Sequence, residues 1–489
     1  MEFNSNYKLR EYKGKVVNQL EKTEGEVLKE KLFNTKKAGW NGLSEEDTRN
    51  VFQFADEYMF YLNQAKTEKE IVHFSKEILL KNDFKELKDV ESLNPGDKVF
   101  WVNRNRSLYI AVIGQEKLEN GLKMVGAHGD SPRIDLKQNP LYEENEVALL
   151  KTHYYGGIKK YQWATVPLAL HGIVAKTNGE RIWISIGEEE TDPVFYITDL
   201  PPHLSRGGQD ARKLSEGIEA EELNIVAGTM PYDDEKVSEK VKLNILRLLN
   251  EKYGIKEVDF TSSELEFVPA YKARSIGFDE SLIGAYGQDD KICCYTSLRS
   301  ILEVTNPTKT AICILTDREE IGFCGVTGME SRSFERFIVE LLEKRGENTP
   351  GMIEKVYANS QAISADVDAG FDPTFSSYYD TRNSCKLGHG VCICKYTGAR
   401  GKSGASEAPA EFVAEIRRVF DENKVAYCSS ELGKVDKGGG GTIAVTFANR
   451  GIDTIDIGVP VLSMHAPYEL TSKFDVYDAY RAYRAFLQN

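Results

Sequence analysis

The sequence has no apolar segment that approaches the roughly 20 residues needed to cross a bilayer. Residues 1–10 are polar and lack the apolar core of a secretory signal peptide, so we expect a cytoplasmic location. The sequence also has no low-complexity tract or short internal repeat, and its 41% hydrophobic and 28% charged residues are ordinary globular values. These absences argue against membrane-spanning, disordered and repeat proteins.

Basic residues are fewer than acidic ones, with 62 Lys and Arg against 76 Asp and Glu, and the formal net charge is −14 at pH 7. A chain of this charge repels nucleic-acid phosphates and anionic lipid. Nucleic acid and membrane surfaces are therefore poor candidate partners, and peptides or small molecules fit better.

The eight cysteines are scattered over 489 residues and make no disulfide framework. Neighbouring Cys293 and Cys294, and likewise Cys392 and Cys394, lack the C-x-x-C spacing of structural zinc sites. We expect reduced and mostly buried thiols.

The first hundred residues have a largely helical pattern. Thr67 and Glu70 form a capping-box motif, apolar residues follow at helical spacing, and Asn82 is a plausible stop. Residues 123–127 are a short apolar run that predicts a strand. From about residue 136 to 273 the pattern changes to β-hairpins, for example at residues 172–185, with one amphipathic helix at 237–252.

After residue 275, strands and helices alternate. We expect helices at residues 291–304, 334–345 and 410–423, and strands at residues 310–316, about 362–367 and 454–459. Such alternation is typical of an α/β fold with a mostly parallel sheet flanked by helices on both faces. In these sheets, ligands bind beyond the carboxyl ends of the strands.

Histidines and carboxylates occur at the predicted strand ends in a set that can hold two divalent ions. Such a pair of ions, about 3.5 to 4 Å apart, needs a bridging carboxylate and further N or O ligands on each side. The set consists of His128 and Asp366 for one ion, Glu320 and His465 for the other, and Asp289 as the bridge. Glu319 is left over as a general base that takes a proton from water and passes it to a leaving amine. Asp130 is expected to hydrogen-bond the other imidazole nitrogen of His128.

Each of these residues also has a simpler explanation. A histidine at a strand end is more often structural, and an adjacent glutamate pair is usually a solvated surface. Asp289 and Asp290 could begin a helix, where carboxylates interact favourably with the helix dipole. Asp368 competes with Asp366 for the role of ligand. The metal hypothesis depends on the joint occurrence of the set at strand ends.

Five segments resemble the aspartyl aminopeptidase family of metallopeptidases, in the family's order and within a region from about residue 34 to the C-terminus. They are residues 126–137 (GAHGDSPRIDLK), 287–294 (GQDDKICC), 316–322 (TDREEIG), 364–373 (SADVDAGFDP) and 459–469 (VPVLSMHAPYE). The resemblance implies the same five ligands and the same base, Glu319. It favours Asp366 over Asp368, and Asp289 over Asp290.

The resemblance also implies a domain organisation and an assembly. The expected catalytic domain is of the zinc exopeptidase type and comes in two parts, residues 1–135 and 275–489. A β-rich dimerisation domain, residues 136–274, interrupts it. The implied assembly is a homo-oligomer, typically a dodecamer that encloses the active sites.

Two departures from the family pattern concern specificity. Gln288-Asp289-Asp290 stands where the family has Leu-Asp-Asn, and the segment that contains His203 has Gly207 in place of a second histidine. His203 is the candidate substrate contact in this segment. Lys386 could pair with an acidic substrate side chain, although an exposed lysine is usually only solvated. The glycines at residues 438–441 could bring N–H groups to the substrate carbonyl or could simply form a flexible turn.

The predicted function is an aminopeptidase that uses two divalent ions to remove N-terminal residues from peptides, with Asp and Glu as candidate residues. Zinc is the expected metal, and manganese and cobalt can share such N/O ligands. One alternative is a deacylase or carboxypeptidase with the same two-metal fold. Another is a catalytically silent assembly protein.

Overall fold

The computed structural model describes residues 22–34 and 38–489. The polar segment at residues 1–10, on which the predicted location depends, lies outside them. The chain divides into two compact units, Met1–Lys37 and Ala38–Asn489. In the first unit, helix α1 (Glu24–Leu32) begins with a capping box made by Thr23 and Glu26. Across the described ranges, every helix falls short of the length and apolar character that a membrane crossing requires.

The second unit begins with helices α2 (Glu45–Gln64) and α3 (Glu68–Lys81). The Thr67 side chain accepts a hydrogen bond from the Glu70 N–H, and the Glu70 carboxylate accepts one from the Thr67 N–H. The helix ends at Asn82, whose N–H donates to a carbonyl of the last turn. The predicted capping box and stop are therefore confirmed.

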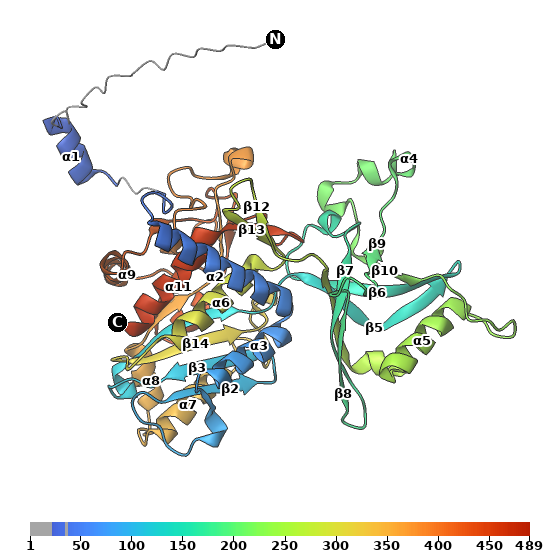
Figure 1. Ribbon diagram of the computed structural model, residues 1–489, viewed down its shortest axis with the longest axis horizontal. Helices are drawn as coiled ribbons and strands as arrows, with labels where there is room; N and C mark the ends of the chain where they lie inside the picture. Colours follow the sequence, from blue (N-terminus) through green and yellow to red (C-terminus); the bar gives the residue numbers. More distant parts are fainter. Residues whose placement is uncertain (1–21, 35–37) are drawn as a thin grey trace, which may run out of the picture. The chain divides into compact units, whose positions relative to one another are not determined.

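A nine-stranded sheet forms the centre of this unit, in the order β1-β2-β3-β14-β4-β15-β21-β17-β19 (Figure 1). Its four central strands, β14, β4, β15 and β21, pair in parallel. Strand β3 is antiparallel to both of its neighbours, and β17 is antiparallel to β21. The strands are β1 (Lys85–Glu86), β2 (Lys98–Asn103), β3 (Ser107–Val112), β4 (Leu122–His128), β14 (Thr310–Thr316), β15 (Gln361–Ser364), β17 (Val391–Cys394), β19 (Tyr427–Ser429) and β21 (Asp453–Gly458).

Helices cover both faces of this sheet because its strands are apolar on both sides. Along β14, Cys313 and Leu315 pack into one hydrophobic cluster, whereas Ile312 and Ile314 pack into another. The first cluster includes side chains of α2, α3, α6 (Gln288–Leu302), α9 (Ala410–Glu422) and α11 (Lys473–Gln488). The second includes side chains of α7 (Ser333–Lys344), α8 (Met352–Ala358) and α10 (Ala444–Ala448). The helices and strands expected after residue 275 are all present, and each begins and ends within three residues of its expected bounds.

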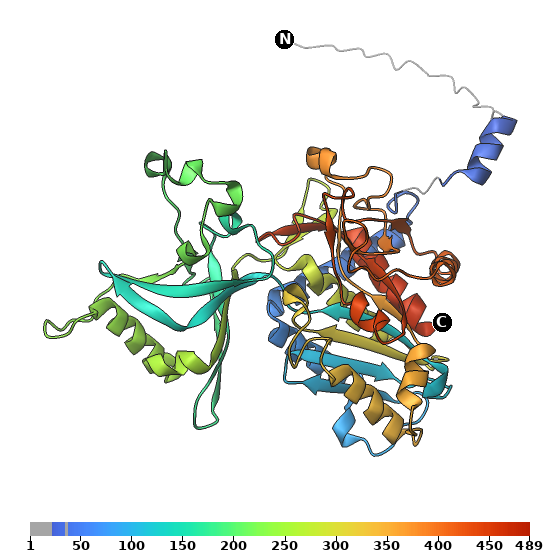
Figure 2. The ribbon, with the colours of Figure 1, turned by 180° about the vertical axis from the view of Figure 1, so that it is seen from behind.

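Residues 133–269 form a separate sheet, drawn in teal and green in Figure 2. It has seven strands in the order β8-β7-β11-β5-β6-β10-β9. Every pairing in it is antiparallel. The expected hairpin is formed by β7 and β8. The strands are β5 (Arg133–Glu144), β6 (Val147–Tyr155), β7 (Leu168–Ala175), β8 (Arg181–Ile186), β9 (Tyr196–Ile197), β10 (Ile225–Gly228) and β11 (Ser263–Pro269).

Helix α5 (Lys240–Tyr253) packs against this second sheet. Val241 is buried, and Ile245 and Leu249 are partly buried against the sheet's hydrophobic core. Leu248, which the periodicity places on the same face, is 47% exposed. The buried stripe of the helix is thus narrower than its apolar pattern.

A five-stranded sheet has the order β12-β13-β23-β22-β16. Its strands are short and have no clear alternation, and the sequence pattern did not predict them. They are β12 (Arg274–Ile276), β13 (Leu282–Ala285), β16 (Asp368–Ala369), β22 (Pro460–Leu462) and β23 (Glu469–Ser472). A two-stranded ribbon pairs β18 (Gly398–Ala399) with β20 (Gly439–Gly440).

Candidate metal centre and its cleft

The candidate residues meet at the carboxyl edge of the central strands. Strand β4 ends at His128, and its register places His128 beside Thr316, the last residue of β14. Glu319 and Glu320 follow in a short 3₁₀ helix, η8 (Glu319–Ile321). Asp366 follows β15, which pairs in parallel with the other side of β4. The parallel centre of the sheet therefore brings three distant segments to one place.

Asp289 lies between the two histidines. Its Oδ1 is 3.2 Å from His128 Nε2, and its Oδ2 is 3.1 Å from His465 Nε2. Asp366 Oδ1 is 3.6 Å from His128 Nε2, and Glu320 Oε1 is 3.5 Å from His465 Nε2. These side chains form two groups of three possible donors that share Asp289.

The donor atoms fit divalent cations. His128 Nε2, Asp289 Oδ1 and Glu320 Oε1 are buried without a hydrogen-bond partner. Buried polar atoms in this state are costly and call for a ligand. Imidazole nitrogen and carboxylate oxygen are ligands that zinc accepts. The five side chains therefore suit divalent metal ions.

The electrostatics of the cluster point the same way. Burial raises the pKa of Glu319 to about 8, and the charge of Asp366 adds to this shift against the opposing charge of His128. Burial, followed by the charge of Asp289, also raises the pKa of Glu320 well above its usual range. Burial by itself would lower the pKa of His465, but the hydrogen bond and charge of Asp289 outweigh it and raise that pKa to about 10. The carboxylates repel one another here, and bound cations would relieve that repulsion.

Both histidines are oriented by main-chain carbonyls. His128 Nδ1 lies 3.0 Å from the carbonyl oxygen of Asp130, and His465 Nδ1 lies 2.7 Å from that of Gly157. A carbonyl oxygen only accepts, so each Nδ1 carries a proton, and Nε2 is the nitrogen that can ligate a cation once its own proton has left.

The sequence predicts that the Asp130 side chain hydrogen-bonds His128. In the structure the main-chain carbonyl of Asp130 makes this contact, and its carboxylate is farther away, at 3.5 Å from Nδ1. The carboxylate instead accepts hydrogen bonds from the N–H groups of Glu319 and Glu320, each at 3.2 Å. It also accepts one from the Tyr155 hydroxyl at 2.9 Å. These donors surround the carboxylate and hold the backbone of η8.

The two competing aspartates are engaged elsewhere. Asp290 accepts a hydrogen bond from the His128 N–H at 3.3 Å. Asp368 accepts one from the Cys394 thiol at 2.9 Å. Asp368 also forms a further group of possible ligands with Cys385 and Cys392, but it is already hydrogen-bonded within the protein. As the cysteine pattern predicts, no disulfide joins the eight cysteines, which all lie within the described residues, and all but Cys324 and Cys428 are buried.

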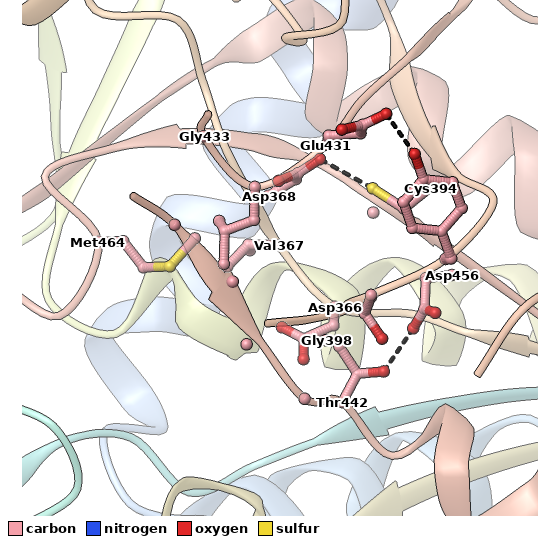
Figure 3. A pocket seen from close by; sticks show the side chains of 18 of the residues that line it. Asp366, Val367, Asp368, Cys394, Gly398, Glu431, Gly433, Thr442, Asp456 and Met464 are labelled. Atoms are coloured by element: carbon pink, nitrogen blue, oxygen red, sulfur yellow. Dashed lines mark hydrogen bonds between the residues drawn. The ribbon is translucent and has the colours of Figure 1, made fainter. Parts of the chain in front are cut away.

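The candidate metal centre opens into a cleft of about 740 Å³. Asp289, Glu319, Glu320, Asp366 and His465 line it, together with the glycines at residues 438–441. On one wall, Thr442 donates a hydrogen bond to Asp456, and Cys394 donates one to Asp368 (Figure 3). Three basic residues also contribute to the lining, namely Arg400, Lys402 and Lys434.

The two predicted substrate contacts lie outside this cleft. His203, in α4 (Pro202–Ser205), and Lys386 are both exposed, and neither is among the described residues that line the cavity of a single chain. The structure adds wall residues such as Tyr396 and Glu431, which lie in loops without periodic pattern, and Asp456, which lies within β21. Outside the cleft wall, the structure also shows a role for Glu469, which lies four residues after His465 in the motif quoted above. Its carboxylate accepts hydrogen bonds from the N–H groups of His465 and Asp289.

Comparisons with known proteins agree on one family. The family model described as aminopeptidase I zinc metalloprotease (M18) matches residues 61–487. A relative from Clostridium acetobutylicum, named "Probable M18 family aminopeptidase 1", is 46% identical over 462 residues, which cover 94% of this chain and 99% of the relative. The crystal structure of an M18-family aminopeptidase from Thermotoga maritima has a TM-score of 0.89 and 44% identity, covering 93% of this chain and 99% of that one.

The fold also extends to more distant proteins. A structure described as the "S. cerevesiae mApe1 dodecamer" has a TM-score of 0.73 and 20% identity, covering 90% of this chain and 97% of that one. At this level of identity the likeness concerns the fold alone.

Proposed function

Because the chain belongs to the M18 family of zinc metalloproteases and is a metallo-aminopeptidase, we propose that two zinc ions act together at the base of its cleft. The proposed ligands are His128 and Asp366 for one ion, Glu320 and His465 for the other, and Asp289 for both. The observation that carries the proposal is the position of Asp289, whose two oxygens face different histidines at 3.2 and 3.1 Å. A shared carboxylate of this kind offsets the repulsion between two cations.

When bound, the ions would polarise the scissile carbonyl and lower the pKa of the attacking water. Glu319 is the proposed general base, since its carboxylate lines the cleft and Oε2 lies 3.9 Å from His128 Nε2. A Glu319 oxygen takes one proton from the water as the new C–O bond forms, and delivers it to the amide nitrogen as the C–N bond breaks. The products are a free amino acid and a peptide shortened by one residue.

The surrounding residues keep the base and the ligands in place. The Asp130 carboxylate accepts hydrogen bonds from the N–H groups of Glu319 and Glu320, so it positions the backbone of both the base and the neighbouring ligand. Glu469 accepts hydrogen bonds from the N–H groups of His465 and Asp289. Binding geometry at such a centre depends on these outer contacts.

We propose that the substrates are peptides with a free N-terminal amine. The cleft carries charges of both signs, with Asp456 and Glu431 among its acidic residues and Lys402 and Lys434 among its basic ones. A preference for N-terminal Asp or Glu would use the basic side chains. We further propose a cytoplasmic homo-oligomer, with the seven-stranded sheet at a subunit interface. The S. cerevesiae mApe1 dodecamer, which shares the fold, supports an assembly of this kind.

One pair of measurements tests the proposal. The purified protein is assayed with a series of aminoacyl peptides and with the same peptides acetylated at the N-terminus, and its metal content is measured by mass spectrometry. We expect hydrolysis of the free-amine peptides only, and two metal ions per chain. Hydrolysis of the acetylated peptides would favour a deacylase, and a single ion per chain would contradict the shared role of Asp289.

A further inference from the structure

Strand β6 of the seven-stranded sheet ends beside the metal centre of the nine-stranded sheet. Its last residue is Tyr155, and Gly156 and Gly157 follow. Tyr155 and Gly157 hydrogen-bond Asp130 and His465, and a side chain at Gly156 would meet Glu320. No step of the proposed reaction uses them, and their contacts indicate a role in holding the centre.

The Tyr155 side chain is held firmly on both sides. Its hydroxyl donates to Asp130 Oδ2 at 2.9 Å, and the Arg133 guanidinium lies 3.8 Å from the centre of its ring. Arg133 is the cross-strand partner of Tyr155, and it is itself buried and paired with Asp135 at 2.8 Å. Tyr155 is therefore a fixed donor.

The Asp130 carboxylate links Tyr155 to the proposed base. Its other donors are the N–H groups of Glu319 and Glu320, so the tyrosine is the one donor of these three that comes from the second sheet. Without the hydroxyl, the carboxylate would lose a directional contact in a buried site. The backbone of η8, and with it the carboxylate of Glu319, would then be less well positioned.

The two glycines allow the chain to approach the centre closely. Gly156 has φ +74°, a left-handed conformation that suits glycine, and a side chain there would meet Glu320 Oε2 at 3.1 Å. The Gly157 carbonyl accepts the hydrogen bond from His465 Nδ1 at 2.7 Å, and a Cβ on Gly157 would lie 3.4 Å from the same nitrogen. Gly157 therefore contacts one proposed ligand, and a side chain at Gly156 would crowd the other proposed ligand of the same ion.

We propose that Tyr155 and Gly157 are positioning residues, through which the seven-stranded sheet sets the geometry of the metal centre. Tyr155 fixes the Asp130 carboxylate and thereby the Glu319–Glu320 segment, and Gly157 fixes the ring of His465. Tyr155 is absent from the described residues that line the cleft, so it acts through Asp130 and does not contact substrate. This inference rests on the proposed function of the site.

The test compares Tyr155→Phe, which removes one oxygen, with the matched control Tyr154→Phe. Tyr154 is the preceding residue of β6, its side chain is 37% exposed, and it points to the opposite face of the strand. For each protein we would measure kcat and KM with a free-amine peptide. With the metal-stripped forms we would measure zinc affinity, by competition with a chelator. We would also measure their thermal unfolding temperature.

We expect Tyr155→Phe to lower kcat and zinc affinity, each by about 10- to 100-fold, with KM changed less than about 3-fold. The unfolding temperature of the stripped protein should stay close to that of the wild type, and Tyr154→Phe should match the wild type in every measurement. Wild-type kcat and zinc affinity in Tyr155→Phe would overturn the inference. So would a lower unfolding temperature with unchanged kcat and affinity, because that pattern indicates a structural role only.

A second variant, Gly157→Val, tests the same inference if Tyr155→Phe fails to fold. A Cβ at residue 157 would already be in van der Waals contact with His465 Nδ1, at 3.4 Å, so the larger valine side chain would crowd the ring. We expect one of the two zinc ions to bind more weakly while the other is retained. Full zinc affinity at both sites would overturn the inference. A wild-type protein that hydrolyses no free-amine peptide would refute the proposed function itself, whereas an active wild type with an unchanged Tyr155→Phe variant refutes only this inference.

Discussion

Glu469 holds His465 in place through a hydrogen bond of 2.7 Å between its Oε1 and the His465 N–H. Its other oxygen accepts a hydrogen bond from the Asp289 N–H at 3.3 Å. Glu469 is buried at the start of β23, so one carboxylate ties together the backbones of two proposed ligands. We expect Glu469→Ala to weaken zinc binding by about 10- to 100-fold. Chelator competition would measure this, and unchanged affinity would show that the two backbones keep their positions without it.

Glu319→Gln should abolish most of the turnover without loss of metal. The amide keeps the size of the side chain but cannot take the proton, so kcat should fall by about 100- to 10,000-fold. Mass spectrometry should still find the metal content of the wild type. Glu354→Gln, on the exposed side of α8, is the matched control and should have wild-type kcat. Near-normal kcat in Glu319→Gln would remove this residue from the mechanism.

Asp289→Asn should lower metal occupancy more than Asp366→Asn does. The amide offers a single oxygen as a ligand, so it could bind only one of the two proposed ions. Asp366 faces His128 only, and its variant should retain the ion on the His465 side. Metal content per chain after dialysis would distinguish the two variants. Equal losses in both would contradict the bridging role of Asp289.

Removal of the metal should destabilise the protein as well as inactivate it. A ligand that binds only the native state stabilises it by about 4 kcal/mol when its free concentration is about 1,000 times Kd. We therefore expect the thermal midpoint to fall on treatment with a chelator and to recover on addition of zinc. The recovery should be smaller in Asp289→Asn. A thermal midpoint that does not respond to zinc would argue against a metal-linked native state.

His171 should make the stability depend on pH above neutrality. Its Nδ1 is 2.7 Å from Glu70 Oε1 and its Nε2 is 3.0 Å from Glu188 Oε1. Burial by itself would lower the pKa of His171, but these carboxylates outweigh it and raise the pKa from 6.5 to about 9. The stabilisation is therefore complete below pH 6.5 and is lost as the pH rises through about 9, a change on the order of 3 kcal/mol.

Urea unfolding at a series of pH values, with zinc held constant, would measure this dependence. The variant His171→Gln should have lower stability at pH 6 and a flatter profile toward pH 10, because it carries no proton to lose. Parallel profiles for the variant and the wild type would show that the His171 charge does not contribute.

Local sequence signals accounted for many of the elements. The α3 capping box depends on two residues three positions apart, and the alternation after residue 275 reflects burial on both faces of the sheet. The β7–β8 hairpin follows from its turn residues. The short strands of the five-stranded sheet carry no such signal, since their pairing depends on segments far apart in the chain.

The side chains available for chemistry could be read from the sequence, because strand ends and family motifs lie along the chain. His128, Asp289, Glu320, Asp366 and His465 stand out there as a set, and the structure brings them together. How that set is held became visible only in the folded chain. The carboxylate of Asp130 accepts a hydrogen bond from η8, and that of Glu469 accepts hydrogen bonds from the backbones of Asp289 and His465. Tyr155, from another sheet, donates to Asp130. The direction of a buried side chain is chosen by the donors around it, and here those donors come from segments that only folding brings together.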